Sequence, residues 1–314
     1  MKHTILPGIL ASFLLLTACN NNSGSEKSAS TTTDSAKIQL ERGEYIATTV
    51  AVCIDCHSKR DTAHFSMPVI PGTEGGGAGF AFSKTEAVPG VVWAPNITPY
   101  ALKDWTDDEI IRTLTTGINK KGDTLFPIMP YHGYSQLTRS DLKAVVAYIR
   151  TLKPIENTVP ERKFFIPAAQ FGPLPQPNLD ANTMPDPSDK VAYGRYMVTM
   201  AACTECHTPM GPQGPDFSKV FSGGFVFDNP VLKVAVANIT PDSATGIGAW
   251  SEETFVKKFR ANASPEMLAT KPGRKNTFMP WSMYGKMKDE DLKAIYAFLR
   301  TVKPIVNKVE KYPQ

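Results

Sequence analysis

The stretch Cys53-Ile54-Asp55-Cys56-His57 decides how this 314-residue chain can be interpreted, because it returns as Cys203-Thr204-Glu205-Cys206-His207. Both copies have the pattern C-x-x-C-H, which is typical of covalent haem attachment. In this chemistry two thiols form thioether bonds to the vinyl groups of the haem, and the histidine ligates its iron. One turn of backbone brings both sulfurs to neighbouring edges of the porphyrin and then directs the histidine at the metal. The sequence therefore predicts two covalently bound haem c groups.

Paired cysteines have three other common uses, and each explains the repeated pentapeptide less well. A zinc site needs four ligands, whereas each histidine here adjoins its own cysteine pair. A thioredoxin-like redox pair is expected in a βαβ context, which is not apparent around either site. A disulfide would give no account of the adjacent histidines. Haem attachment is the favoured interpretation.

The first 18 residues are expected to be an export signal of the lipoprotein type. Lys2 supplies a positive charge, residues 5–16 are largely apolar, and Leu16-Thr17-Ala18-Cys19 resembles the lipobox of bacterial lipoproteins. The apolar part is too short for a comfortable transmembrane helix. We expect Cys19 to be lipidated and to anchor an exported protein to the cell membrane, facing the periplasm; an ordinary cleaved signal is the alternative. With the other four cysteines assigned to haem, no structural disulfide is expected.

The remainder of the chain is an internal duplication with a linker between the copies. Residues 141–155 match residues 291–305 at an offset of 150, and Asn96-Ile97-Thr98-Pro99 returns as Asn238-Ile239-Thr240-Pro241. Residues 153–190 contain eight prolines and are expected to be extended and semi-rigid. The predicted parts are a flexible tether (19–36), a first domain (37–154), a linker (155–189), a second domain (190–307) and a tail (308–314).

Helical periodicity is clear in the first repeat. Thr106 with Glu109, and Thr138 with Asp141, have the spacing of capping boxes. Pro154 is expected to end the last helix. The apolar spacing predicts helices over residues 38–52, 106–114 and 142–152.

Two features of the first repeat concern its glycines. Gly43 is a poor choice for a helix, but it recurs as Gly194, and we expect it to let another helix cross closely. Residues 68–90 are rich in glycine and are expected to be irregular.

Each haem iron also needs a second axial ligand or an open position. Met129 follows His57 by 72 residues, and Met279 follows His207 by the same interval. Both methionines precede a proline, which restrains the loop that would present the sulfur. His132 is a rival ligand for the first haem, but the duplication gives it no histidine counterpart. Histidine and methionine are therefore the expected ligands of both irons.

The order of helix, C-x-x-C-H, loops, Met-Pro and final amphipathic helix resembles class I cytochrome c in both repeats. The A-N-I-T-P type segment, residues 246–251 and the D-L-K-A helix are similar to the cytochrome subunits of bacterial membrane-bound alcohol and gluconate dehydrogenases. The resemblance covers residues 37–307 and implies a mainly α fold, with two tandem cytochrome c-like domains of a few helices around a covalent haem. By this resemblance the residues that serve the first haem are Cys53, Cys56, His57 and Met129, and those that serve the second are Cys203, Cys206, His207 and Met279.

The expected function is electron transfer rather than catalysis. Fixed methionine ligands suit it, because little reorganisation accompanies the redox change. The expected partners are redox proteins, such as a dehydrogenase, a quinol-oxidising complex or a terminal oxidase; a two-haem peroxidase-like enzyme with one labile distal ligand is the alternative. The formal net charge is only +4 and no run of Lys or Arg is present, so nucleic acid is not an expected partner.

Overall fold

The computed structural model describes residues 1, 23–81, 90–161, 163–164, 167–212 and 214–313. The predicted lipidation site, Cys19, and all but the first residue of the predicted signal lie outside them. By its internal contacts the chain divides into Met1–Ile38 and Gln39–Gln314. Within the described residues, no helix combines the length and the apolar character needed to cross a membrane.

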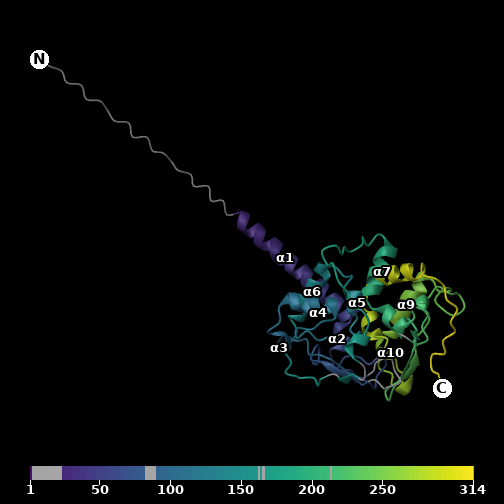
Figure 1. Cartoon of the computed structure of the whole chain (residues 1–314). Helices are drawn as coiled ribbons and strands as arrows, with labels where there is room; N and C mark the ends of the chain where they lie inside the picture. Colours follow the sequence, from purple (N-terminus) through teal and green to yellow (C-terminus); the bar gives the residue numbers. More distant parts are fainter. Residues whose placement is uncertain (2–22, 82–89, 162, 165–166, 213, 314) are drawn as a thin grey trace. The chain divides into compact units, whose positions relative to one another are not determined.

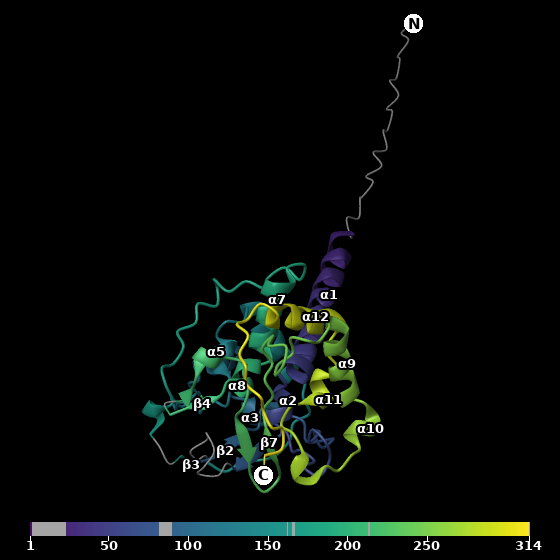
Figure 2. The same ribbon diagram turned by 90° about the vertical axis from the view of Figure 1, so that its right-hand side faces the viewer.

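The described chain is mainly helical, as predicted, with a few short strands (Figures 1 and 2). The helices of the first repeat are α1 (Ser23–Tyr45), α2 (Cys53–Cys56), α3 (Pro99–Leu102), α4 (Asp107–Thr116), α5 (Tyr131–Tyr134) and α6 (Arg139–Ile149). Those of the second are α7 (Lys190–Met200), α8 (Cys203–His207), α9 (Glu252–Asn262), α10 (Pro265–Leu268), α11 (Trp281–Tyr284) and α12 (Asp289–Leu299). Shorter turns are a π-helical turn η1 (Ile46–Val50) and 3-10 turns η2 (Ala168–Gln170), η3 (Phe217–Lys219) and η4 (Gly273–Lys275).

The first helix differs from its prediction at both ends. It begins at Ser23 rather than near Ile38, so most of the segment expected to be a flexible tether is helical. That segment contains no proline that would end a helix. At the other end the helix widens into the π-helical turn η1, where the amide of Ala51 donates to the carbonyl oxygen of Ile46 over 2.8 Å. This turn delivers the chain to Cys53.

The glycines of the first helix in each repeat mark close helix crossings, as predicted. A Cβ atom built at Gly43 would overlap the backbone carbonyl of Ala144 in α6. A Cβ atom at Gly194 would overlap the carbonyl of Ala294 in α12 in the same way. Figures 1 and 2 show α12, in yellow, lying against α7. Glycine is needed at both positions because the two helix backbones touch.

Side-chain caps begin two helices of the first repeat. Thr106 and Glu109 form the predicted capping box of α4, with both reciprocal bonds present. Thr138 caps α6 by accepting from the amide of Asp141 over 3.1 Å, but the carboxylate of Asp141 does not return the bond. That carboxylate instead accepts from Arg42 and from Tyr196. The cap of α6 is thus confirmed, whereas the reciprocal half of its predicted box is wrong.

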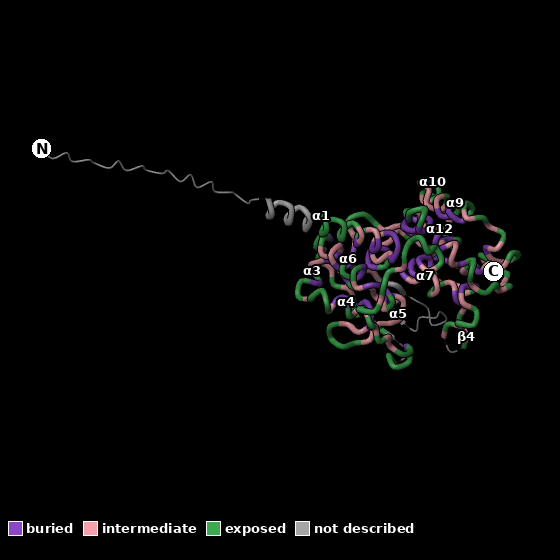
Figure 3. Tube along the Cα trace, turned by 90° about the horizontal axis from the view of Figure 1, so that it is seen from above, coloured by how far each residue is buried: buried purple, intermediate pink, exposed green. Residues whose placement is uncertain are grey.

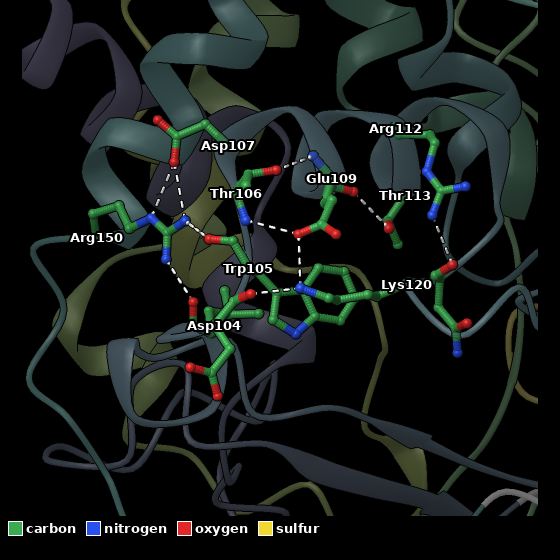
Figure 4. A network of polar contacts seen from close by, with 11 residues as sticks. Asp104, Trp105, Thr106, Asp107, Glu109, Arg112, Thr113, Lys120 and Arg150 are labelled. Atoms are coloured by element: carbon green, nitrogen blue, oxygen red, sulfur yellow. Dashed lines mark hydrogen bonds and ion pairs between the residues drawn. The ribbon is translucent and has the colours of Figure 1, made fainter.

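Arg150, at the end of α6, fixes the segment that leads into α4 (Figure 4). Its guanidinium donates to the carbonyl oxygens of Leu102 and Trp105 over 2.7 and 2.5 Å. It also pairs with the carboxylate of Asp107 at 3.0 Å. Lys120 adds bonds to the carbonyl of Asp104 and to the capping carboxylate of α4, over 2.5 and 3.0 Å. The contacts of Arg150 thus join the end of α6 to the start of α4.

Short antiparallel strands occur where residues 68–90 were expected to be irregular. Strand β1 (Ala78–Ala81) pairs with β2 (Gly90–Ala94), and Gly90 of β2 lies opposite Phe164 of β3 (Lys163–Phe164) in the linker. The linker is thereby tied to the first repeat, because an exposed strand edge is a ready pairing partner. The strands of the second repeat are β4 (Met210–Gly211), β5 (Gly214–Pro215), β6 (Val226–Asp228) and β7 (Lys233–Ala235), paired β4 with β5 and β6 with β7.

Buried apolar residues of both repeats belong to one hydrophobic cluster. It includes Ile46 and Leu142 of the first repeat together with Met197 and Leu292 of the second, all almost fully buried. In Figure 3 many residues along α6, α7 and α12 are coloured purple, which marks them as buried. The repeats therefore pack directly against each other.

Candidate functional site

The two C-x-x-C-H motifs have the same local geometry. Each forms a short helix, α2 or α8, and each is preceded by a non-glycine residue in the left-handed region, Val52 with φ 47° and Ala202 with φ 51°. The left-handed residue breaks the preceding helix, so that the motif starts a new turn in a new direction. The thiols of Cys53 and Cys203 are half-buried. The four motif cysteines form no disulfide among the described residues, and Cys56 and Cys206 are exposed.

A backbone carbonyl fixes the imidazole of each motif histidine. Nδ1 of His57 lies 2.7 Å from the carbonyl oxygen of Pro95, and Nδ1 of His207 lies 2.8 Å from that of Ala237. A carbonyl oxygen can only accept, so Nδ1 carries the proton and Nε2 keeps its lone pair. Burial lowers the pKa of both histidines, which favours the neutral, metal-binding form. Such an outer hydrogen bond orients metal-binding histidines in proteins.

The carbonyls of Pro95 and Ala237 are functional groups that the sequence analysis missed. Pro95 and Ala237 each directly precede the repeated N-I-T-P segment. The asparagine of that segment anchors the backbone beside the carbonyl through its side-chain hydrogen bonds. The side-chain amide of Asn96 donates to the carbonyl oxygens of Ile155 and Asn157 over 2.8 and 3.0 Å. Asn238 donates in the same way to Ile305 over 2.8 Å. The repetition of the asparagine in a loop was the signal that could have identified this role.

The two candidate methionine ligands occupy equivalent turns. Met129 and Met279 are partly buried and pack against the same hydrophobic cluster as Cys53 and Cys203. The carbonyl of each methionine accepts a bond from the amide two residues later, over 2.7 and 2.8 Å respectively. The proline between them shapes this narrow turn. Met129 and Met279 thus pack, like Cys53 and Cys203, against the one hydrophobic cluster that both repeats share.

The other two histidines of the first repeat, His132 and His64, are placed differently. His132 is half-buried, with its ring 4.6 Å from that of Tyr131, and burial lowers its pKa. Nδ1 of His64 lies 2.7 Å from the carboxylate of Asp61 in a loop. The ring of His64 is therefore engaged in a local pair.

Two buried tyrosines support the motifs and were also missed. The hydroxyl of Tyr134 donates to the carbonyl of Ala51 over 3.1 Å, and that of Tyr284 to the carbonyl of Ala201 over 2.6 Å. Burial raises the pKa of both tyrosines well above its ordinary value, so they remain neutral donors. Each bond ties the turn after a candidate methionine to the residue two positions before a motif.

One buried carboxyl group lies inside the first motif. Asp55 is 3% exposed, and burial raises its pKa to about 6. The guanidinium of Arg60 opposes this shift from 3.1 Å away. The pair ties the attachment motif to the loop that follows it.

The donor set at each motif suits a haem rather than a closed zinc site. Within the described part of the chain, no three His, Cys, Asp or Glu side chains gather as a metal cluster requires. Each motif instead offers two thiols and a neutral imidazole with a free Nε2, close to a cluster that also contains a thioether. These are the groups that hold a haem c with histidine and methionine ligands.

Comparison with known proteins agrees with this donor set. Residues 191–303 match the family Cytochrome c. The cytochrome c subunit of a quinone alcohol dehydrogenase from Gluconacetobacter polyoxogenes is 29% identical over 300 aligned residues, which cover 87% of this chain and 58% of the relative. The gluconate 2-dehydrogenase cytochrome c subunit of Pantoea cypripedii is 27% identical, with 84% and 59% covered. This chain thus spans somewhat more than half the length of these dehydrogenase subunits.

A shorter relative matches along most of its own length. A protein of Cereibacter sphaeroides named diheme cytochrome c-type is 25% identical over 263 residues, which cover 81% of this chain and 82% of the relative. The matches to the dehydrogenase subunits cover more than four fifths of this chain and so extend well beyond the second repeat. Residues 191–303 are therefore a cytochrome c domain, and the chain is similar to the cytochrome c subunits of alcohol and gluconate dehydrogenases.

Proposed function

We propose that the protein is a two-haem electron carrier. The observation that carries this proposal is the repeated fixing of a neutral motif histidine by a backbone carbonyl, at 2.7 and 2.8 Å. In the first repeat the thiols of Cys53 and Cys56 bind the haem, and His57 and Met129 ligate its iron. In the second repeat these roles belong to Cys203, Cys206, His207 and Met279.

The bound haem supplies a one-electron couple between ferric and ferrous iron. The residues of the chain prevent a substrate from binding to the iron. Nε2 of each histidine and the sulfur of each methionine would hold the haem iron, so that no ligand position would remain for a substrate. The carbonyls of Pro95 and Ala237 hold the imidazoles in one orientation. A thioether ligand raises the reduction potential relative to a second histidine.

The proposed partners are redox proteins. The relatives are named as subunits of a quinone alcohol dehydrogenase, a gluconate 2-dehydrogenase and a fructose dehydrogenase. By analogy, this chain takes electrons from a dehydrogenase or a quinol-oxidising complex and passes them to an acceptor such as a terminal oxidase. Catalysis on the organic substrate belongs to another subunit.

The proposed location is the periplasmic face of a cell membrane, with Cys19 as the lipid anchor. The lipobox-like residues before Cys19 support it. Growth with a labelled fatty acid should label the wild-type protein and not a Cys19→Ala variant, which should move to the soluble fraction. Equal labelling of the two proteins would contradict the anchor.

The axial ligands can be tested by visible absorption of the purified holoprotein, oxidised and reduced, with and without carbon monoxide. The wild type should contain two haems per chain, show the weak red sulfur-to-iron band and ignore carbon monoxide. Met129→Ala and Met279→Ala should each lose about half of that band and open one haem to carbon monoxide. Met267→Ala, at an exposed methionine, is the matched control.

Two results would contradict the carrier proposal. An unchanged spectrum in Met129→Ala or Met279→Ala would remove that methionine from its assigned role. Carbon monoxide binding by one haem of the wild type would show a labile distal position, which is the property expected of a peroxidase-like enzyme. A Cys53→Ser/Cys56→Ser variant should retain one haem per chain, and retention of two would refute the first attachment site.

A further inference from the structure

A loop of the first repeat contacts the methionine turn of the second. The hydroxyl of Ser66 donates to the carbonyl oxygen of Met279 over 2.9 Å. The amide of the neighbouring Phe65 donates to the carbonyl of Thr270 over 2.9 Å. Ser66 is fully buried, so its bond to the methionine turn is shielded from water.

Asn276, three residues before Met279, is held almost entirely by the same loop. Its side-chain oxygen accepts from the amide of Ser66 over 2.9 Å. Its amide nitrogen donates to the carbonyls of His64 and Thr62 over 2.8 and 3.3 Å. Asn276 is fully buried, so the loss of these bonds would leave polar groups of both repeats unsatisfied.

The loop has a strained backbone that other contacts hold in place. Ser66 and Met67 both lie in the left-handed region, with φ 64° and 47°. The guanidinium of Arg60 donates to the carbonyls of Ser66 and Met67 over 3.0 and 2.8 Å, and it pairs with Asp55 of the first motif. The side chain of Met67 is buried against Leu232 of the second repeat. Strained residues of this kind persist where their surroundings determine the conformation, and they are frequent at functional positions.

Among the described residues, the second repeat does not contain the side chains that form this arrangement in the first. At the offset of 150, Met210 stands in place of Arg60 and Asp216 in place of Ser66. Phe126 stands in place of Asn276, and its ring packs edge-on against Phe171 of the linker at 5.1 Å. Met129 is therefore presented beside an aromatic contact, whereas Met279 is presented by a buried polar network.

We propose that residues 60–67 of the first repeat position Met279, so that the axial ligation of the second haem depends on the first repeat. This inference rests on the proposed ligation of the second haem by Met279. Ser66 and Asn276 are positioning residues: they fix the backbone on either side of the thioether and restrict its departure from the iron. The two haems are consequently inequivalent, and the second keeps its methionine more firmly than the first. The chain from Asp55 through Arg60 and Ser66 to Met279 links the first attachment motif to the second ligand turn.

The test compares Ser66→Ala and Asn276→Ala with Asn182→Ala in the holoprotein. Asn182 is the matched control, because its amide also donates to two carbonyls, those of Ser135 and Leu137 at 2.9 Å, away from the second methionine turn. Ser66→Ala loses one hydrogen bond, so the open form of the second haem should become about fivefold more populated. Asn276→Ala should give a larger increase. The readouts are the rate of carbon monoxide binding, the red sulfur-to-iron band and the two midpoint potentials.

The inference predicts that Ser66→Ala and Asn276→Ala bind carbon monoxide faster and have a lowered midpoint potential at one haem only. Asn182→Ala should behave like the wild type at that haem. A second variant background identifies the haem: in Met279→Ala, adding Ser66→Ala should change nothing further. Wild-type spectra, binding rates and potentials in a folded Ser66→Ala protein would overturn the inference while leaving the proposed ligand intact. Equal changes at both haems would also overturn it. An unchanged spectrum in Met279→Ala would instead refute the ligand assignment itself.

Discussion

Tyr45 of the first repeat donates a hydrogen bond to the buried carboxylate of Asp291 in the second, over 2.5 Å. The second repeat returns this contact, because Tyr196 donates to the buried carboxylate of Asp141 over 2.8 Å. Each tyrosine hydroxyl also accepts a hydrogen bond from a backbone amide of the other repeat. The hydroxyl of Tyr45 accepts from the amide of Lys288 over 2.9 Å, and that of Tyr196 accepts from the amide of Thr138 over 3.1 Å. The duplication has thus produced an interface in which equivalent residues exchange equivalent bonds.

The tyrosine bonds should stabilise the packing of the repeats unequally. In Tyr196→Phe the carboxylate of Asp141 keeps two hydrogen bonds from the guanidinium of Arg42. In Tyr45→Phe the carboxylate of Asp291 keeps one hydrogen bond, from the hydroxyl of Tyr193. We expect Tyr196→Phe to lower the free energy of unfolding by about 1 kcal/mol and Tyr45→Phe by about 2 kcal/mol. Urea unfolding measures both.

The control for this comparison is Tyr100→Phe, whose exposed hydroxyl lies 3.3 Å from Glu156 and should contribute less than about 0.5 kcal/mol. Equal losses in Tyr45→Phe and Tyr100→Phe would show that the bond to Asp291 does not stabilise the interface.

The glycines at the helix crossings should not tolerate a methyl group. In Gly43→Ala or Gly194→Ala the new Cβ would overlap a carbonyl of the crossing helix, so the two helices must separate. We expect each change to lower the free energy of unfolding by about 1–3 kcal/mol. Gly211→Ala is the control, because the nearest atom to its new Cβ lies at an ordinary 3.5 Å. Thermal unfolding of Gly194→Ala at the wild-type temperature would disprove the close crossing.

Arg150 and its counterpart Arg300 should differ in their contribution to stability. Arg150 reaches the carbonyls of Leu102 and Trp105 and the carboxylate of Asp107, whereas Arg300 donates to the carbonyl of Gly248 over 2.6 Å. A lysine cannot reproduce this forked pattern. Arg150→Lys should therefore cost about 2 kcal/mol and Arg300→Lys about 1 kcal/mol, measured by chemical unfolding. The reverse order would refute the role of the network in Figure 4.

The cap of α4 should make stability depend on pH. The amide of Thr106 and the ammonium group of Lys120 lower the pKa of Glu109 below its ordinary value of 4.5. The folded protein binds fewer protons at this site than the unfolded chain, so the contribution is present above about pH 4.5 and is lost as the pH falls. Glu109→Gln should melt below the wild type at pH 7, and the difference should shrink as the pH falls below about 4.5.

Asp108→Asn is the matched control for this pH dependence, since it removes a charge from the same turn but neither bond of the cap. If Asp108→Asn shows the same loss between pH 7 and pH 3 as Glu109→Gln, the capping bonds are not its cause.

Much of the helical fold could be predicted because its signals are local. The capping box at Thr106 and Glu109 and the glycines at the crossings depend on residue types at fixed spacings. The hairpin of β1 and β2 was missed, because a glycine-rich stretch has little strand propensity until a partner strand lies beside it. The helical start of α1 was missed because polar composition does not distinguish a flexible tether from a solvated helix.

The sequence by itself determined the two attachment motifs, the equal spacing of Met129 and Met279, and the duplication that relates them. Only the tertiary structure decided which carbonyl orients each histidine and which repeat holds the turn of Met279. The reason is physical: every residue has a carbonyl and nearly every residue an amide, so residue type does not identify the one that is used. Ser66 and Met279 are also 213 residues apart, and no local pattern connects them. Their contact exists because two similar repeats pack face to face with different side chains in the loops between.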